Sequence, residues 1–272
     1  MCLSYIGGKS RIGKWITEYI PKDIETYVEP FGGMFWVFFK MKPESMENLT
    51  RVVYNDFNKL NTNFMKCIST KHKEVLSFML DIPSQERERF NQYQKDIFSD
   101  DVTFNQDGDV GLAVKYAYVL TQVWSGTNPK KGTFIDLKGK YKSKFDTFRD
   151  KLSNPKWTNL FEKITIVENL DFQDVIEKYD SPTTFVYLDP PYWKTEEYYS
   201  NHDFDRGDHE RLAKCIQGVS GRFSLSYYDF ELLHEWFPEG VYTWESKEFA
   251  KAAGAKTGQK QSKGTELLIM NY

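Results

Sequence analysis

The sequence predicts an α/β fold built on a doubly wound, mostly parallel sheet of seven strands. Short apolar runs that suit buried strands recur along the chain, and helical patterns such as residues 58–69 and 207–217 separate most of them. The 272 residues are enough for one catalytic domain of ordinary size and a smaller inserted one. The predicted strands are residues 25–29, 51–56, 164–168, 184–189, 221–227, 240–246 and 265–271.

The series of strands is interrupted between about residues 58 and 160. Helix-like stretches fill most of this interval, and a Gly- and Lys-rich segment, residues 125–144, follows them. Within that segment, Gly132 to Leu137 predicts a strand that would form part of a hairpin. We therefore expect a catalytic domain made of residues 1–57 and 161–272, and a mostly helical insertion made of residues 58–160.

The tetrapeptide Asp189-Pro190-Pro191-Tyr192 directly follows the apolar run 184–188. It would therefore lie at the carboxyl edge of the sheet, where open α/β sheets bind ligands. A planar exocyclic amine must become more tetrahedral before it attacks an electrophile. Asp189 can accept one of its N–H groups, and a carbonyl held out by the stiff proline pair can accept the other. Taken alone, the tetrapeptide fits a strand-ending turn equally well, because proline cannot continue a central strand.

Several further motifs accompany the tetrapeptide along nearly the whole chain. They are Tyr5-Ile6-Gly7-Gly8-Lys9, Tyr27-Val28-Glu29-Pro30-Phe31-Gly32-Gly33, Val52-Val53-Tyr54-Asn55-Asp56, Glu168-Asn169-Leu170-Asp171-Phe172, Leu225-Ser226-Tyr227-Tyr228-Asp229 and Glu266-Leu267-Leu268-Ile269-Met270-Asn271-Tyr272. In type and order, this set resembles the motifs of the Dam-like (D12 class) adenine-specific DNA N6-methyltransferases. The resemblance implies the Rossmann-like fold of class I methyltransferases, with an antiparallel last strand, and S-adenosylmethionine as the cofactor.

The resemblance also implies which residues bind the cofactor. Glycines let the backbone turn tightly and approach a ligand, and an acid at the end of the next strand can accept both ribose hydroxyls. Lys9 would face the methionine carboxylate, Asp56 the ribose and Asp171 the adenine amine. The full set is Tyr5, Lys9, Glu29, Phe31, Gly32, Gly33, Asp56, Asp171, Phe172 and Asp189.

The implied reaction is direct in-line transfer of the sulfonium methyl group to N6 of adenine in double-stranded DNA. The base would be flipped into a pocket bounded by the catalytic residues Asp189, Pro190, Pro191 and Tyr192, and Tyr192 would offer it a stacking face. Alignment and desolvation would supply most of the catalysis, because the sulfonium is already a good leaving group. Asp189 need not be a strong base, since the amine becomes acidic only after the methyl group is attached.

One residue departs from the family pattern. Phe35 stands two places after Gly33, where the family usually has a second small residue. We favour the interpretation that a helix begins here and buries the ring against the sheet, which the apolar run through Phe39 supports. The alternative is a reshaped or weakened cofactor pocket.

The formal net charge of −3 and the pI of about 5.9 do not by themselves suggest a DNA partner, so the distribution of charge matters more. The stretch from Lys130 to Lys144 contains six lysines and one acid, and the stretch from Lys247 to Lys263 contains five lysines and one acid. Both stretches lie outside the predicted strands, where they could follow phosphates; alternatively, they are solvated surfaces. The predicted DNA-binding residues are Asn128, Lys130, Lys131, Thr133, Asp136, Lys138, Lys140, Lys256 and Lys260.

Metal and membrane chemistry find little support in the sequence. Cys2, Cys67 and Cys215 are far apart, and no histidine pair has a familiar ligand spacing, so we expect no metal. Unpaired cysteines and the lack of a long apolar run predict a soluble, cytoplasmic protein with no membrane partner.

Two other functions stay open at this stage. One is methylation of another planar amine, in RNA or on a glutamine side chain, although related glutamine methylases usually have Asn in the first motif position. The other is a non-catalytic nucleic-acid-binding protein that lost its cofactor, which Phe35 keeps possible. The sequence also leaves open the recognition site, methylation of one or both strands, the oligomeric state and the biological role, whether in restriction-modification or in a phage.

Overall fold

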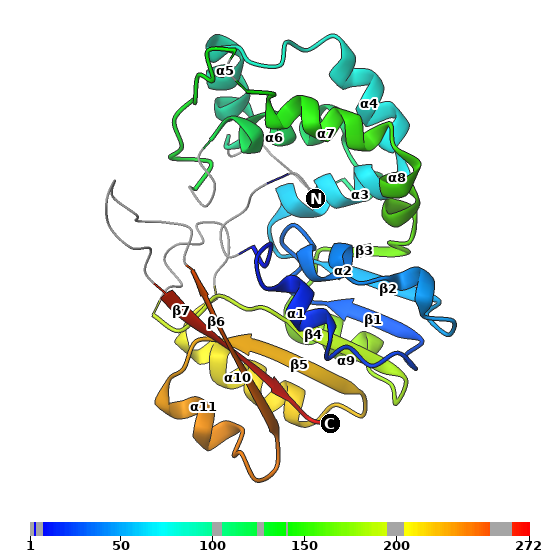
Figure 1. The fold of residues 1–272 in the computed structure, drawn as a ribbon, viewed down its shortest axis with the longest axis vertical. Helices are drawn as coiled ribbons and strands as arrows, with labels where there is room; N and C mark the ends of the chain where they lie inside the picture. The colour runs from blue at the N-terminus through cyan, green and yellow to red at the C-terminus, as the bar shows by residue number, and fades with distance from the viewer. Residues whose placement is uncertain are drawn as a thin grey trace.

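Seven strands form a single sheet in the computed structural model, which describes residues 3, 8–99, 105–123, 128–139, 141–194, 204–250 and 263–272. The strand order is β3-β2-β1-β4-β5-β7-β6, and only the pairs made by β7 are antiparallel (Figure 1). The predicted fold class, including the antiparallel last strand, is confirmed. The strands are β1 Thr26–Glu29, β2 Arg51–Asn55, β3 Ile166–Glu168, β4 Thr184–Leu188, β5 Arg222–Tyr227, β6 Thr243–Ala250 and β7 Lys263–Met270.

Helices cover both faces of this sheet. Successive residues of a strand point to opposite faces, so Tyr27 belongs to one hydrophobic core and Val28 to the other. Because both faces are buried, β4 has apolar residues at consecutive positions from Phe185 to Leu188, and the serines at positions 224 and 226 of β5 are also buried. The helices are α1 Gly13–Thr17, α2 Trp36–Lys40, the 3-10 helix η1 Pro43–Ser45, α3 Lys59–Thr70, α4 His72–Leu80, α5 Arg87–Ile97, α6 Val110–Gln122, α7 Lys144–Leu152, α8 Pro155–Glu162, α9 Phe172–Tyr179, α10 Arg206–Gln217 and α11 Glu231–Trp236.

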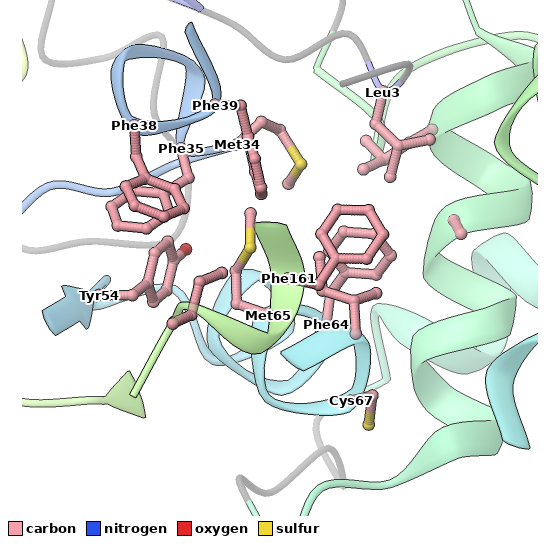
Figure 2. Packing of buried hydrophobic residues seen from close by; sticks show 14 of the residues in the cluster. Leu3, Met34, Phe35, Phe38, Phe39, Tyr54, Phe64, Met65, Cys67 and Phe161 are labelled. Atoms are coloured by element: carbon pink, nitrogen blue, oxygen red, sulfur yellow. The ribbon is translucent and has the colours of Figure 1, made fainter. Parts of the chain in front are cut away.

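The helices α4 to α7 form a separate layer beyond the β3 side of the sheet (Figure 1). The helix α3, predicted as residues 58–69, joins this layer to the sheet because it packs against β2 and β3 and also against α6 and α8. Phe64 on α3 and Phe161 on α8 lie in the same core as the residues of the sheet (Figure 2). One hydrophobic core therefore runs from the sheet into the inserted helices.

The order of the strands creates a topological switch point between β1 and β4. The chain runs outward from β1 through β2 to β3, and then returns to place β4 on the other side of β1. The connections diverge on either side of this pair, which leaves a crevice at the carboxyl ends of the strands. Glu29 ends β1 and Asp189 directly follows β4, so both lie at this edge.

Two predictions about the lysine-rich segments are wrong. Residues 132–137 form no strand, because glutamine side chains and the end of α6 bind the backbone groups that a strand partner would take. Gln85 donates to the oxygen of Ile135 at 2.9 Å and accepts from the nitrogen of Leu137 at 3.2 Å, and the Ile135 nitrogen donates to the oxygen of Gln122. The second segment does not lie wholly outside strands, since Lys247 lies in β6 and Lys263 in β7.

Candidate active site

The tetrapeptide predicted to be catalytic, residues 189–192, begins at the switch point and is held by Lys9. The Lys9 ammonium donates to Oδ1 of Asp189 at 2.6 Å and to the hydroxyl of Tyr192 at 2.5 Å. It also lies over the Tyr192 ring, 4.8 Å from its centre. Lys9 and Tyr192 are buried, whereas 19% of the Asp189 side chain stays exposed. The acid is thus the part of this group that a ligand can reach.

Glu266 on β7 completes the group from the other side. Its side chain is 1% exposed, its Oε1 accepts a hydrogen bond from the Tyr192 hydroxyl, and the Lys9 ammonium lies 3.3 Å from the same oxygen. The sequence analysis quoted the motif that contains Glu266 but gave this residue no role. An acid directly before the apolar run 267–270 was the signal that could have identified it, because buried acids require partners.

Two carboxylates therefore share one ammonium in a buried position. Burial raises the pKa of Asp189, while the charge and hydrogen bond of Lys9 lower it. Burial also raises the pKa of Glu266, Lys9 lowers it, and the nearby charge of Asp189 raises it. With both acids ionised the cluster has an excess of negative charge, which favours a cationic ligand.

The glycine loop after β1 packs tightly against β2. A Cβ atom at Gly32 would lie 2.3 Å from the Tyr54 ring, so only glycine fits there. Gly33 has a positive φ of 48°, and its nitrogen donates to Oδ2 of Asp56 at 2.8 Å. The Asp56 carboxylate also accepts from the nitrogen of Asn58 at 2.7 Å and from the amide of Asn61 at 3.0 Å. The loop and the acid predicted to bind ribose are thus one hydrogen-bonded unit.

Phe35 is fully buried in the core and does not line this loop. Its ring stacks on Phe38 with centres 4.7 Å apart and meets the Tyr54 ring edge-on at 5.1 Å (Figure 2). Phe35 itself adopts a left-handed backbone conformation, with φ of 54°, and α2 begins at the next residue, Trp36. The interpretation that this ring packs against the sheet is confirmed.

Glu29 is used inside the protein. Its Oε1 accepts from the Tyr27 hydroxyl at 2.5 Å and from the Phe38 nitrogen at 3.2 Å, and the residue is 2% exposed. Burial is the main reason that the pKa of Glu29 rises to about 8. These contacts tie β1 to the first turn of α2, so the structure gives Glu29 a role in holding the loop in place.

The other predicted cofactor residues form an aromatic and charged group at the start of α9. The Phe31 ring packs against Phe172 at 5.5 Å and against Phe204 at 5.7 Å. Asp171 caps α9, and Arg211 donates to its two carboxylate oxygens at 2.6 and 2.9 Å. This pairing with Arg211 is the main reason that the pKa of Asp171 is lowered. An adenine amine would have to share the carboxylate with Arg211.

Phe57 was not predicted as a site residue. It directly follows Asp56 at the carboxyl end of β2, and 49% of its surface is exposed. A single exposed ring is common on protein surfaces, so the interest of Phe57 lies in its position beside the acid predicted to bind ribose. Its position next to the acid could have been recognised from the sequence.

The described members of the predicted DNA-binding set lie in the segment between α6 and α7. Lys130, Lys131, Thr133, Asp136 and Lys138 are exposed, and Asn128 is half-buried with its side chain accepting from the Lys130 nitrogen at 2.9 Å. The predicted residues that lie outside the described part of the structure are Tyr5, Lys140, Lys256 and Lys260.

Metal-binding groups and membrane spans were searched over the same described ranges. No group of three or more His, Cys, Asp or Glu side chains there is arranged to hold a metal ion. In these ranges, every helix is too short or too polar to cross a membrane.

Comparisons with known proteins agree with this arrangement. A family model described as D12 class N6 adenine-specific DNA methyltransferase matches residues 5–250. The Type II methyltransferase M.CviBI of Paramecium bursaria Chlorella virus NC1A is 25% identical over 99% of this chain and 98% of its own length. M.MjaIII of Methanocaldococcus jannaschii is 28% identical over 99% and 98%, and M1.LlaDCHI of Lactococcus lactis subsp. cremoris is 24% identical over 98% and 94%. The chain therefore belongs to the D12 class of N6 adenine-specific DNA methyltransferases.

Proposed function

We propose that this methyltransferase modifies adenine N6 at a specific site in double-stranded DNA, that S-adenosylmethionine is the methyl donor, and that the target base is flipped out of the duplex to reach Asp189. One observation carries the proposal. The partly exposed Asp189 lies at the switch point of a doubly wound sheet, and its carboxylate forms an ion pair with the buried Lys9. Type II methyltransferases among the relatives support a site-specific role in modification of DNA.

The residues beside the switch point suit the cofactor. Asp56 is a half-buried carboxylate at the end of β2, which fits the ribose hydroxyls, and Phe57 presents an open apolar face for the adenine ring. Gly32 and Gly33 keep side chains out of the loop that would border the donor. S-adenosylmethionine, when bound, supplies a methyl group on a cationic sulfonium, and the partly exposed carboxylate of Asp189 is an anionic group that such a cation can approach.

Some predicted cofactor contacts need adjustment. Lys9 already donates to Asp189, so it would have to weaken that pair in order to meet a methionine carboxylate. We assign Lys9 mainly to the catalytic acid and Asp171 to the Arg211 pair that fixes the start of α9. Phe31 and Phe172 were predicted only as cofactor-binding residues, and we assign them to the border of the adenine because their rings pack together at the start of α9.

The catalytic residues act on the amine of the target base. Asp189 accepts one N–H of the amine, and the carbonyl of Pro190 accepts the other, which draws the nitrogen lone pair out of conjugation with the ring. Both prolines are buried and rigid, so the two acceptors keep a fixed separation. After the new N–C bond has formed, the amine is acidic, and its proton passes to Asp189 or to water.

Residues 58–160 are proposed as the part that recognises the target. Their helices lie beyond one edge of the sheet, and the segment after α6 exposes Lys130, Lys131 and Lys138 without an ion-pair partner among the described contacts. Exposed lysines can follow DNA phosphates, and neighbouring polar side chains such as Thr133 and Asp136 can read base edges in the major groove.

The experiment is methyl transfer from labelled S-adenosylmethionine to unmethylated double-stranded DNA. Wild type and Asp189→Ala are compared, and the digested nucleosides are identified by mass spectrometry. The proposal expects N6-methyldeoxyadenosine from the wild type and at least a hundredfold less from the variant, because catalysis rests on the alignment of the amine. Methylation confined to RNA or to a protein amide would overturn the assignment of the substrate.

Cofactor binding is measured separately by calorimetry. Asp56→Ala should weaken S-adenosylmethionine binding at least tenfold, because it removes the ribose acceptor and one anchor of the loop. A folded wild type that binds no S-adenosylmethionine would instead favour a non-catalytic nucleic-acid-binding protein.

A further inference from the structure

Glu266 takes no part in the reaction proposed above, although it lies within the catalytic group. It is fixed on β7 by backbone pairing with Lys247 of β6, and its side chain is almost completely enclosed. A buried carboxylate is costly unless its charge is compensated, and here the compensation comes from Lys9 and from the Tyr192 hydroxyl. The same Lys9 also binds the acid that must receive the adenine amine.

The contacts of Lys9 create a conflict for catalysis. The Oδ1 atom of Asp189 accepts a hydrogen bond from the Lys9 ammonium at 2.6 Å. An ammonium bound this closely lowers the ability of the carboxylate to accept a hydrogen bond from a neutral amine. Glu266 offers the ammonium a second anionic partner 3.3 Å away, so a small rotation of the lysine end would move it between the two acids.

We propose that Glu266 is a positioning residue that draws Lys9 and Tyr192 toward β7, so that Asp189 is released to bind the amine of the flipped adenine. The inference rests on the proposed function, in which Asp189 accepts an N–H of the substrate. Tyr192 links the two halves of the group, because its hydroxyl accepts from Lys9 and donates to Glu266. The ring offered to the base is therefore held by the same carboxylate.

Glu29 is another buried acid near Lys9, but it cannot take the role proposed for Glu266. Its Oε1 is bound by the Tyr27 hydroxyl and the Phe38 nitrogen, inside the loop that follows β1. Glu266 is the acid that directly contacts both Lys9 and Tyr192. Removing the charge of Glu266 should therefore change the chemistry at Asp189 without disturbing the loop that borders the cofactor.

The first test compares Glu266→Gln with Glu266→Asp. Glutamine keeps an oxygen acceptor for Tyr192 but loses the charge, whereas aspartate keeps the charge on a shorter side chain. Glu266→Gln is expected to lower kcat on the order of tenfold to a hundredfold, with S-adenosylmethionine affinity within about twofold of wild type. Glu266→Asp should recover part of the loss. Equal kcat for wild type and Glu266→Gln would overturn the inference, as would a parallel loss of cofactor affinity.

Glu210→Gln is the matched control. Glu210 is an exposed acid of α10 that pairs with Lys214, so the substitution removes the same charge far from the catalytic group. It is expected to leave kcat unchanged. Thermal unfolding of all variants shows which of them fold. If Glu266→Gln does not fold, Glu266→Asp is tested in its place, and a kcat equal to that of wild type would then overturn the inference.

The second test asks whether Glu266 acts through Lys9. If it does, Glu266→Gln will cause little further loss in a Lys9→Met background, because the ammonium that it positions is already absent. Multiplicative losses in the double variant would overturn the inference. Failure of the proposed function is distinguishable. Wild type would then produce no N6-methyldeoxyadenosine, which overturns both proposals, whereas an active wild type with an unaffected Glu266→Gln overturns only the role of Glu266.

Discussion

The ammonium of Lys9 lies 2.6 Å from Oδ1 of Asp189, although the two residues are 180 positions apart in the sequence. Lys9 lies shortly before α1, and its side chain meets the acid that directly follows β4. The aspartate that is proposed to be catalytic is therefore held by a residue near the N-terminus. This arrangement makes the charge balance of the site depend on tertiary structure, and the first prediction follows from it.

Lys9→Met should destabilise the protein by roughly 3–5 kcal/mol near pH 8, because it leaves two buried acids without their cation. Without Lys9, the pKa values of Asp189 and Glu266 in the folded protein should rise further above their unfolded values. The deficit should then shrink as the pH falls and both acids become protonated. Denaturant unfolding at several pH values measures the difference in the free energy of unfolding between wild type and Lys9→Met. Lys14→Met, at an exposed lysine of α1, is the control, and an equal deficit at all pH values would contradict the explanation.

Gly32→Ala should damage the loop that borders the cofactor. The new Cβ would lie 2.3 and 2.6 Å from atoms of the Tyr54 ring and 2.9 Å from the oxygen of Asn55. Relieving the overlap must shift the loop, so we expect about 1–3 kcal/mol of destabilisation and at least a tenfold loss of S-adenosylmethionine affinity. Calorimetry and thermal unfolding provide the measurements. Gly240→Ala, where a Cβ meets nothing within 4 Å, should leave both quantities unchanged.

Phe35→Leu should affect stability and leave cofactor binding intact. The ring is fully buried among Tyr27, Phe38, Phe39 and Tyr54, so a smaller side chain leaves unfilled space in the core. We expect about 1–2 kcal/mol of destabilisation, with S-adenosylmethionine affinity within about twofold of wild type. A variant of unchanged stability that binds the cofactor several-fold more weakly would show that Phe35 shapes the pocket after all.

Glu29→Gln should change how stability depends on pH. The pKa of Glu29 is raised from its ordinary value of 4.5 to about 8 in the folded protein, so the folded state keeps a proton that the unfolded state loses. The resulting stabilisation is complete below about pH 4.5 and disappears as the pH rises toward 8, at about 1.4 kcal/mol per pKa unit as an upper limit. Wild type should therefore lose stability relative to the glutamine variant between these values. Unfolding of Glu47→Gln, at an exposed acid, should follow the wild-type curve.

The sequence by itself determined the series of elements and the edge at which the site lies. An apolar run identified β4, because a strand buried on both faces can be apolar along its whole length, whereas β6 has no fully buried residue and no such run. The pattern at residues 58–69 likewise predicted α3, which spans Lys59–Thr70. The position of Asp189 directly after a strand placed it at the carboxyl edge, since that inference needs only the direction of one strand.

Local patterns failed where distant groups supply the partners. The segment 132–137 has the spacing of a strand, yet Gln85 and Gln122 take its backbone hydrogen bonds, and no periodicity of the segment records that. The strands β6 and β7 also extend past their predicted bounds, to Ala250 and from Lys263, because the predicted bounds followed the apolar residues alone. The outer part of this strand pair, where Lys263 pairs with Glu248, is exposed and lacks an apolar signal.

Only the tertiary structure decided which side chains form the catalytic group. Lys9, Asp189, Tyr192 and Glu266 come from three distant segments, and their hydrogen bonds depend on the path that the chain takes around the sheet. The same holds for Asp171, whose predicted ligand contact has a competitor in Arg211 from α10. Residue type shows what a side chain is able to bind, but the partner that it does bind depends on which groups folding brings within about 3 Å of it.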